Sequence, residues 1–141
     1  MAMELSRAHY PVTVLGWGRR AGLWLQGCSI RCRGCMAKDT WARRPERAVP
    51  VPAIVDWLDS LGPLDGLTVS GGEPLDQAEE LTLLLRAVRE RWPSGFDVLC
   101  YTGRELGQAK AVSPELFELA DAVAAGPFEP GCPPAPALSG L

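Results

Sequence analysis

The sequence predicts an α/β fold built around a parallel sheet, in a single domain. The chain has 141 residues, of which 47% are hydrophobic, and that is enough to build one core. Short apolar runs near residues 67, 98 and 123 alternate with helical patterns. Spacings of roughly thirty residues between such runs are typical of βαβ units, in which neighbouring strands run parallel. Irregular glycine-containing loops follow these runs, and sites in parallel α/β folds form at the carboxyl ends of strands.

The first half of the chain is expected to contribute two strands and two helices. Val12–Leu15 and Gly22–Leu25 are short apolar runs of the strand type, and Met36–Arg44 is expected to form a short helix. Pro50–Leu61 is predicted as a longer helix with Pro52 in its first turn, where a missing N–H costs nothing. Its apolar residues at helical spacing are Ile54, Val55, Leu58 and Leu61.

The second half repeats the alternation of strand and helix. Leu67–Ser70 is predicted as a buried strand, and the next helix is expected to begin with a capping box over Asp76–Glu79. The apolar stripe of that helix comprises Leu81, Leu84, Leu85, Val88 and Trp92. Phe96–Tyr101 is predicted as a strand, the Ser113–Pro114 pair as the N-cap and first residue of a helix, and Ala122–Ala125 as a weaker strand.

Composition and charge exclude several classes of protein. Only 22% of the residues are charged and the net charge is −3, so neither a disordered chain nor a nucleic-acid-binding protein is indicated. No apolar run approaches the ~20 residues that span a bilayer, and no secretory signal is visible. The basic residues concentrate between Arg19 and Arg47, which favours an anionic ligand or an acidic partner near that segment, or simply a solvated face.

The end of the chain differs in composition from the rest. Residues 126–141 hold five prolines and three glycines, so we expect an extended or disordered tail. The predicted organisation is therefore a domain over residues 1–125 followed by a Pro/Gly-rich tail.

Three of the five cysteines form a C-x3-C-x2-C pattern at Cys28, Cys32 and Cys35. This crowding favours metal chemistry in a reducing compartment such as the cytoplasm over a disulfide framework. Three thiolates suit a [4Fe–4S] cluster with one open iron, whereas structural zinc requires a fourth ligand and ordinarily uses C-x2-C pairs. Thiols that bind no metal are the third alternative. The other residues that could supply a fourth ligand are His9, Cys100 and Cys132.

Three further loops follow predicted strands. They are Gly71-Gly72-Glu73-Pro74, Thr102-Gly103-Arg104 and Gly126-Pro127-Phe128. Parallel strands end at one edge of a sheet, so these loops and the cysteine loop are expected to share a rim. Paired glycines let the backbone approach a ligand closely, although a plain strand-to-helix turn would use them too. Glu73 can pair with a cationic ligand, or it can be a surface acid at a helix N-terminus.

These motifs together resemble the radical S-adenosylmethionine (SAM) superfamily, and in particular the small proteins that activate glycyl-radical enzymes. The similarity rests on the cysteine pattern together with Leu23–Cys28, Asp39–Trp41, Thr68–Leu75, Tyr101–Gly103 and Gly126–Phe128. It covers roughly residues 10 to 130. The resemblance implies a partial (β/α) barrel of about four βα units, with an open parallel sheet that a protein substrate would help to close.

The resemblance also implies an activity and its cofactors. Cys28, Cys32 and Cys35 would hold a [4Fe–4S] cluster whose fourth iron binds SAM. One electron from an external donor such as flavodoxin or ferredoxin would cleave SAM to a 5′-deoxyadenosyl radical. That radical would generate a glycyl radical on a partner enzyme. The residues expected to contact SAM are Gly34, Met36, Ser70, Gly71, Gly72, Glu73, Thr102 and Gly103.

Other functions remain open at this stage. A radical SAM enzyme could modify a peptide or a small molecule instead of a glycyl-radical enzyme. The cysteine loop could also belong to a non-catalytic iron–sulfur module or to a zinc-binding structural module. Individual residues have structural alternatives as well, because Met36 could be core filler and Arg104 an ordinary exposed arginine.

Overall fold

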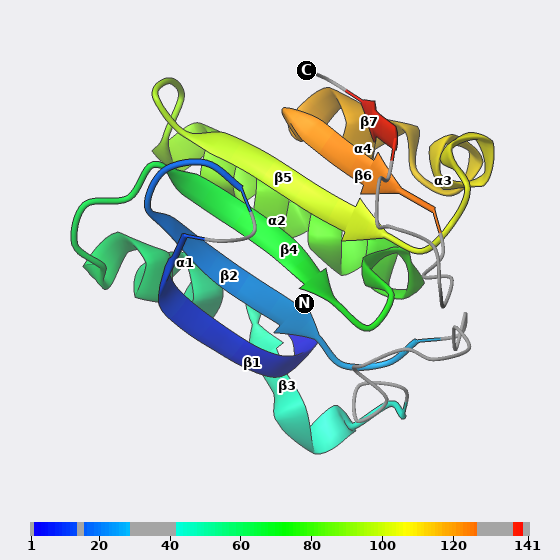
Figure 1. The fold of residues 1–141 in the computed structure, drawn as a ribbon. Helices are drawn as coiled ribbons and strands as arrows, with labels where there is room; N and C mark the ends of the chain where they lie inside the picture. Colours follow the sequence, from blue (N-terminus) through cyan, green and yellow to red (C-terminus); the bar gives the residue numbers. More distant parts are fainter. Residues whose placement is uncertain (1, 14–15, 29–41, 127–136, 140–141) are drawn as a thin grey trace.

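The fold is an open α/β sheet with helices packed on one face (Figure 1). The computed structural model describes residues 2–13, 16–28, 42–126 and 137–139. In these residues, seven strands form one sheet in the order β3-β1-β2-β4-β5-β6-β7. The two outer strands are separated by the full width of the sheet, so the sheet is not closed into a barrel.

The centre of the sheet is parallel, as the sequence predicts. It consists of β2 (Arg20–Leu25), β4 (Gly66–Gly71), β5 (Asp97–Thr102) and β6 (Ala122–Ala125). Each pairs in parallel with the next in this order, and their arrowheads all point to the lower right in Figure 1. The loops that follow these strands therefore leave from one edge of the sheet, which is where a site is expected.

Antiparallel strands flank this centre on both sides. β1 (Ala2–Val12) pairs with β2, and the short β3 (Ala48–Pro50) pairs with the first residues of β1. On the opposite side β7 (Ala137–Ser139) pairs with β6. The composition of the tail does not predict β7, whereas the Ala122–Ala125 strand that it joins is predicted with its observed bounds.

The helices lie on one face of the sheet. α1 (Val51–Ser60) precedes β4, while η3 (Pro74–Gln77) and α2 (Ala78–Arg91) connect β4 to β5. α3 (Leu106–Val112) and α4 (Pro114–Leu119) connect β5 to β6. α2 packs between α1 and α4 behind the sheet in Figure 1. Within the described part of the chain, no helix is long and apolar enough to cross a membrane.

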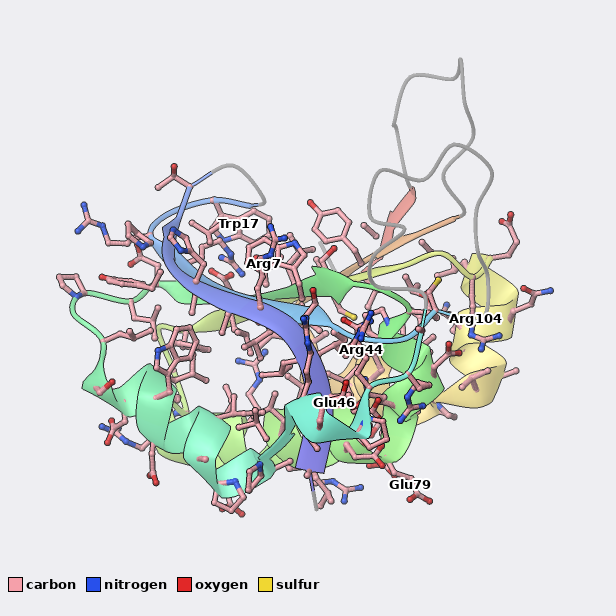
Figure 2. The ribbon with its side chains drawn as sticks, turned by 90° about the horizontal axis from the view of Figure 1, so that it is seen from below. Arg7, Trp17, Arg44, Glu46, Glu79 and Arg104 are labelled. Carbon is pink, nitrogen blue, oxygen red and sulfur yellow. The ribbon has the colours of Figure 1, made fainter. Side chains whose placement is uncertain are left out.

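Strand alternation assigns the two faces of the sheet different roles. Leu23, Leu25 and Val69 belong to the apolar core beneath the helices, with 1% exposure or less. Trp24 and Ser70 are direct register partners between these core residues, so their side chains point to the other face. Figure 2 shows Arg7 and Trp17 on that same face, away from the helices. Among the described residues no helix covers this face.

Three local predictions are wrong. The strand expected at Val12–Leu15 instead runs from Ala2 to Val12, where polar residues interrupt the apolar ones and two neighbouring strands provide the pairing; residues 14–15 lie outside the described residues. The helix expected over Met36–Arg44 does not include residues 42–44, which precede a short 3-10 helix, η2 (Pro45–Arg47), and residues 36–41 lie outside the described residues. The sequence also does not predict α3.

The third local prediction that is wrong is the capping box expected at the start of α2. The N-cap of α2 is Gln77, whose side chain makes no capping bond, and Asp76 instead bonds to Arg104. The capping carboxylate is Glu73, which accepts the backbone N–H of Leu75 at the start of η3. The helical segment therefore begins one turn earlier than the apolar stripe indicates. By contrast, Ser113 caps α4 as predicted, accepting from Leu116 N.

Candidate active site at the carboxyl edge of the sheet

Two of the predicted loops are joined to each other by backbone hydrogen bonds at the carboxyl edge. The Gly72 amide donates to the Leu25 carbonyl at 2.9 Å, and the Glu73 amide donates to the Gly27 carbonyl at 2.8 Å. The loop after β4 thus extends the parallel pairing beyond β2. As a result, the Gly71–Glu73 backbone lies directly beside the residues that lead into Cys28.

Gly71 is required at its position by both conformation and space. Its φ is +106°, and a Cβ there would overlap the backbone nitrogen of Leu25 and lie 2.7 Å from the carbonyl carbon of Trp24. These are backbone atoms of β2, which cannot rotate away as a flexible side chain could. The glycine therefore lets β4 stay close to β2 where the loop departs.

Glu73 connects the loop after β4 to the loop after β5. Its Oε2 accepts the Thr102 hydroxyl at 2.7 Å and the Leu75 amide at 3.0 Å, while its Oε1 accepts the Gly103 amide at 2.8 Å. The residue is only 1% exposed. Burial raises the pKa of the Glu73 carboxyl above its ordinary range, and the bonds from Thr102 and the two amides work in the opposite direction.

Arg104 adds a positive charge beside this carboxylate. Its Nη2 donates to Asp76 Oδ1 at 2.9 Å, and its Nε lies 3.8 Å from Glu73 Oε2. Its side chain is 27% exposed, so it is not the exposed surface arginine of the structural alternative. Figure 2 shows it beside the loop after β5, at the right of the molecule. The buried Nε has no hydrogen-bond partner among the described residues, which leaves a donor next to the loops.

The structure brings six of the predicted site residues together and leaves others undescribed. The neighbouring residues are Ser70, Gly71, Gly72, Glu73, Thr102 and Gly103. Cys28 is half-buried and begins the next segment of the same edge. The predicted residues Cys32, Cys35, Gly34 and Met36 lie outside the described residues.

Cys100 does not belong to this edge site. It is 0% exposed within the apolar core, as expected for a small buried hydrophobe, and burial raises the pKa of its thiol. A protonated core thiol is a poor metal ligand. In the part of the chain that the structure describes, no group of three or more His, Cys, Asp or Glu side chains could hold a metal ion.

The donor chemistry at this edge fits an iron–sulfur cluster and an amino-acid-like ligand. A cysteine sulfur is the soft ligand that iron–sulfur clusters use, and Cys28 carries one at the rim. The adjoining glycine backbone of Gly71 and Gly72, the Glu73 carboxylate and the Arg104 guanidinium offer acceptors and donors of both signs. An ammonium and a carboxylate group can therefore both find partners here.

Sequence reasoning missed the residues that surround the base of the cysteine segment. They are Glu4, Gln77 and Arg43, which come from β1, η3 and the segment before η2 and lie beside Gln26 of the predicted Leu23–Cys28 motif. No short motif marks them, because each contacts residues far away along the chain. The only signal that the sequence offers is the presence of polar side chains in or beside strands.

The raised pKa of Glu73 predicts a pH-dependent contribution to stability. With a folded pKa above the ordinary value of 4.5, the folded state holds the proton more tightly than the unfolded state does. The stability contributed by Glu73 is thus present at pH values below 4.5 and is lost as pH rises through the raised pKa. In urea unfolding of cluster-free protein, we expect wild type to gain stability relative to Glu73→Gln as the pH is lowered from neutral to 4.5.

The hydroxyl of Thr102 provides the matched control for this measurement. Its bond to Glu73 lowers the pKa of that carboxyl, so Thr102→Val is expected to move the pH window upward while Thr102→Ser leaves it in place. An equal difference between wild type and Glu73→Gln at both pH values would contradict the prediction.

Comparisons with known proteins identify a family and several relatives of this chain. A family model described as "4Fe-4S single cluster domain" matches residues 14–134. The anaerobic ribonucleoside-triphosphate reductase-activating protein of Pasteurella multocida is 30% identical over 130 residues, which cover 86% of this chain and 82% of that protein. The pyruvate formate-lyase-activating enzyme of Staphylococcus aureus is 41% identical over 86 residues, covering 55% of this chain and 34% of that protein.

A solved structure is similar in fold. The crystal structure of QueE from Escherichia coli matches with a TM-score of 0.57 and 20% identity, over 72% of this chain and 53% of that chain. The family match and the activating relatives assign a [4Fe–4S] cluster and SAM as the cofactors, which removes the zinc alternative for the cysteine motif. The chain therefore belongs to the family of 4Fe-4S single cluster domains and, together with its activating relatives, to the radical SAM enzymes.

Proposed function

We propose that this enzyme generates a glycyl radical on a partner enzyme. The observation that carries the proposal is the similarity to a reductase-activating protein over 86% of the chain, which includes both loops that Glu73 joins. The second activating relative acts, by its name, on a different partner, pyruvate formate-lyase. Both names describe activation of a protein. They therefore support a protein substrate more directly than they support any particular partner enzyme.

The proposed cluster ligands are Cys28, Cys32 and Cys35. When bound, the reduced cluster and SAM together supply one-electron cleavage of the sulfonium bond. The chain itself binds, orients and shields these groups. Gly34 and Met36 are proposed to border the adenine, and the remaining contacts are proposed for Ser70, Gly71, Gly72, Glu73, Thr102 and Gly103.

Glu73 is proposed to have two roles at this edge of the sheet. A carboxylate offers about four acceptor positions, and described residues fill three of them. The remaining position on Oε1 can receive the SAM ammonium. The same carboxylate fixes Thr102 and Gly103 against the loop after β4, so it also sets the spacing of the two loops. Binding and positioning are thus combined in one buried side chain.

The open face of the sheet supports a protein substrate. We propose that the sheet is a partial (β/α) barrel whose uncovered face, with Trp24, Ser70 and Tyr101, receives a segment of the partner. Such a segment would exclude water from the site while the reaction proceeds. An external donor such as flavodoxin or ferredoxin would supply the electron. A reducing cytoplasm is the compartment that suits a thiolate-bound cluster.

The test combines the reconstituted protein, dithionite, SAM and an anaerobic ribonucleotide reductase from the same genome under argon. We expect a glycyl doublet by electron paramagnetic resonance (EPR) and release of 5′-deoxyadenosine. A partner in which the radical glycine is replaced by alanine is the matched control and should give no doublet. Release of 5′-deoxyadenosine without any protein radical would favour modification of a peptide or small molecule. No 5′-deoxyadenosine at all would leave a non-catalytic iron–sulfur module.

A further inference from the structure

Residues on the two sides of the cysteine segment are tied to each other at its base. Gln26–Cys28 leads into the undescribed residues 29–41, and Ala42–Arg44 follows them. The Gln26 side chain, which is 0% exposed, donates from Nε2 to the Ala42 carbonyl at 2.7 Å. A Cβ on Gly27 would overlap Cδ of Arg43, so the Arg43 stem lies against the Gly27 backbone. The two ends of the segment therefore meet.

Glu4 on β1 holds the end that follows the segment. Its Oε2 accepts both Nε of Arg43, at 2.9 Å, and Nη2 of the same guanidinium. Its Oε1 accepts the backbone N–H of Arg44 at 2.6 Å. One carboxylate thus binds a side chain and the adjacent main chain, which fixes orientation as well as position. Figure 2 shows Arg44 beside β1.

The main chain of Glu4 holds the end that precedes the segment. The backbone N–H of Gln26 donates to the backbone carbonyl of Glu4 at 2.9 Å. The buried Gln77 side chain accepts from the Glu4 amide at 2.8 Å and donates to the carbonyls of Glu4 and Gln26, each at 3.1 Å. Gln77 lies in η3, directly after the Gly71–Pro74 loop. The base of the cysteine segment is thereby connected to the loop proposed to contact SAM.

Burial and charge indicate that this junction is a built feature and not a surface contact. The Glu4 side chain is 11% exposed, whereas the paired Arg43 side chain is 53% exposed. The bonds from Arg43 hold the pKa of the Glu4 carboxyl below its ordinary range, so the carboxylate stays charged. An exposed ion pair alone would contribute little to stability, and the significance of this one is the geometry that it imposes on Arg44.

We propose that Glu4 is a positioning residue for the iron–sulfur cluster, acting through Arg43 and Arg44. In this proposal Glu4 holds the two ends of the cysteine segment together. The entropy cost of bringing Cys28, Cys32 and Cys35 to one cluster is then smaller, because part of the loop is already closed. This inference rests on the proposed function, because it concerns the cluster that those cysteines hold. Glu4 itself touches neither cluster nor SAM in this scheme.

The test compares wild type with Glu4→Gln and Arg43→Lys. Both substitutions keep the backbone bonds of Glu4, while the first removes the charge and the second removes the two-point guanidinium contact. In cluster-free protein we expect faster amide hydrogen exchange at Arg44 in Glu4→Gln. In reconstituted protein we expect the cluster to be lost to a chelator roughly tenfold faster in both variants, as for other groups that orient metal ligands.

Glu115→Gln is the matched control, since it removes the exposed Arg86–Glu115 ion pair on the helical side and should leave cluster loss unchanged. If Glu4→Gln speeds Arg44 exchange but its cluster is lost at the wild-type rate, the positioning role is overturned and the proposed function stands. If wild type itself assembles no cluster, the proposed function fails and this inference fails with it. The EPR spectrum of the reduced cluster with SAM should also broaden in the variants.

Discussion

Replacing Gly71 with alanine is expected to destabilise the fold by about 2–6 kcal/mol, which is a large part of the roughly 5–15 kcal/mol that stabilises a native protein. The backbone at Gly71, with φ of +106°, costs an L-residue roughly 1–3 kcal/mol. Overpacking against the backbone of Leu25 and Trp24 costs about as much again, because β2 would have to move away from β4. Urea unfolding of cluster-free protein measures the change.

Two other glycines separate the contributions of strain and of crowding. Gly95 has a φ of +72° but no atom within 4 Å of an added Cβ, so Gly95→Ala should cost only the backbone strain, about 1–2 kcal/mol. Gly107 lies in α3 with open space around it, so Gly107→Ala should stabilise by about 0.5–1 kcal/mol. Gly71→Ala with the same effect as Gly95→Ala would show that β2 and β4 are not in close contact there.

The parallel half of the fold is predicted from the sequence because its signals are local. α1, α2 and β6 follow from helical spacing, breakers and short apolar runs within each segment. β1 is different, since its strand conformation is fixed by pairing with β2 and β3, and polar residues interrupt its apolar ones. An apolar run is then a poor guide, and the strand is placed too late in the sequence.

The buried Arg20 illustrates a second limit of sequence reasoning. It starts β2 and is 0% exposed, with Nε donating to the Thr68 hydroxyl at 2.7 Å and Nη2 to the Leu67 carbonyl at 2.8 Å. It also pairs with Asp97 at the start of β5. Composition places it in the basic Arg19–Arg47 segment, for which the sequence predicts an anionic ligand or acidic partner, or simply a solvated face. Leu67, Thr68 and Asp97 are 47 or more residues away along the chain, so only the fold reveals that Arg20 is structural.

The sequence predicts the loops of the candidate site but not the hydrogen bonds that join them. The order of residues after β4 and β5 identifies Gly71–Glu73 and Thr102–Gly103 as loops at one edge. It does not reveal that the Glu73 carboxylate bonds to Thr102 and Gly103, because that contact depends on the parallel pairing of the two strands. The same holds for Glu4 and Arg43, which are separated by 39 residues.

The largest functional loss is expected when Cys28, Cys32 or Cys35 is replaced by serine. A serine hydroxyl is a hard oxygen ligand and does not replace a thiolate on iron, so the cluster would keep two protein ligands and no stable open iron. Iron content after anaerobic reconstitution should fall to background, and 5′-deoxyadenosine formation from SAM should fall below detection. The absorbance near 400 nm and the EPR signal of the reduced cluster should disappear with it.

Cys100 makes this experiment specific, because a thiol can also be removed from a cysteine that lies in the core. Cys100→Ala removes a thiol that is 0% exposed, so it should cost about 1 kcal/mol of stability and leave the iron content and SAM cleavage unchanged. Loss of iron in Cys100→Ala would place a ligand in the core and contradict the three-cysteine assignment. Retention of SAM cleavage in Cys28→Ser would contradict it equally, since Cys28 is the proposed ligand that directly follows Gly27, whose carbonyl accepts the Glu73 amide. Cys28→Ser and Cys100→Ala together therefore distinguish a cluster held only by the cysteine loop from a cluster that also takes a ligand from the sheet.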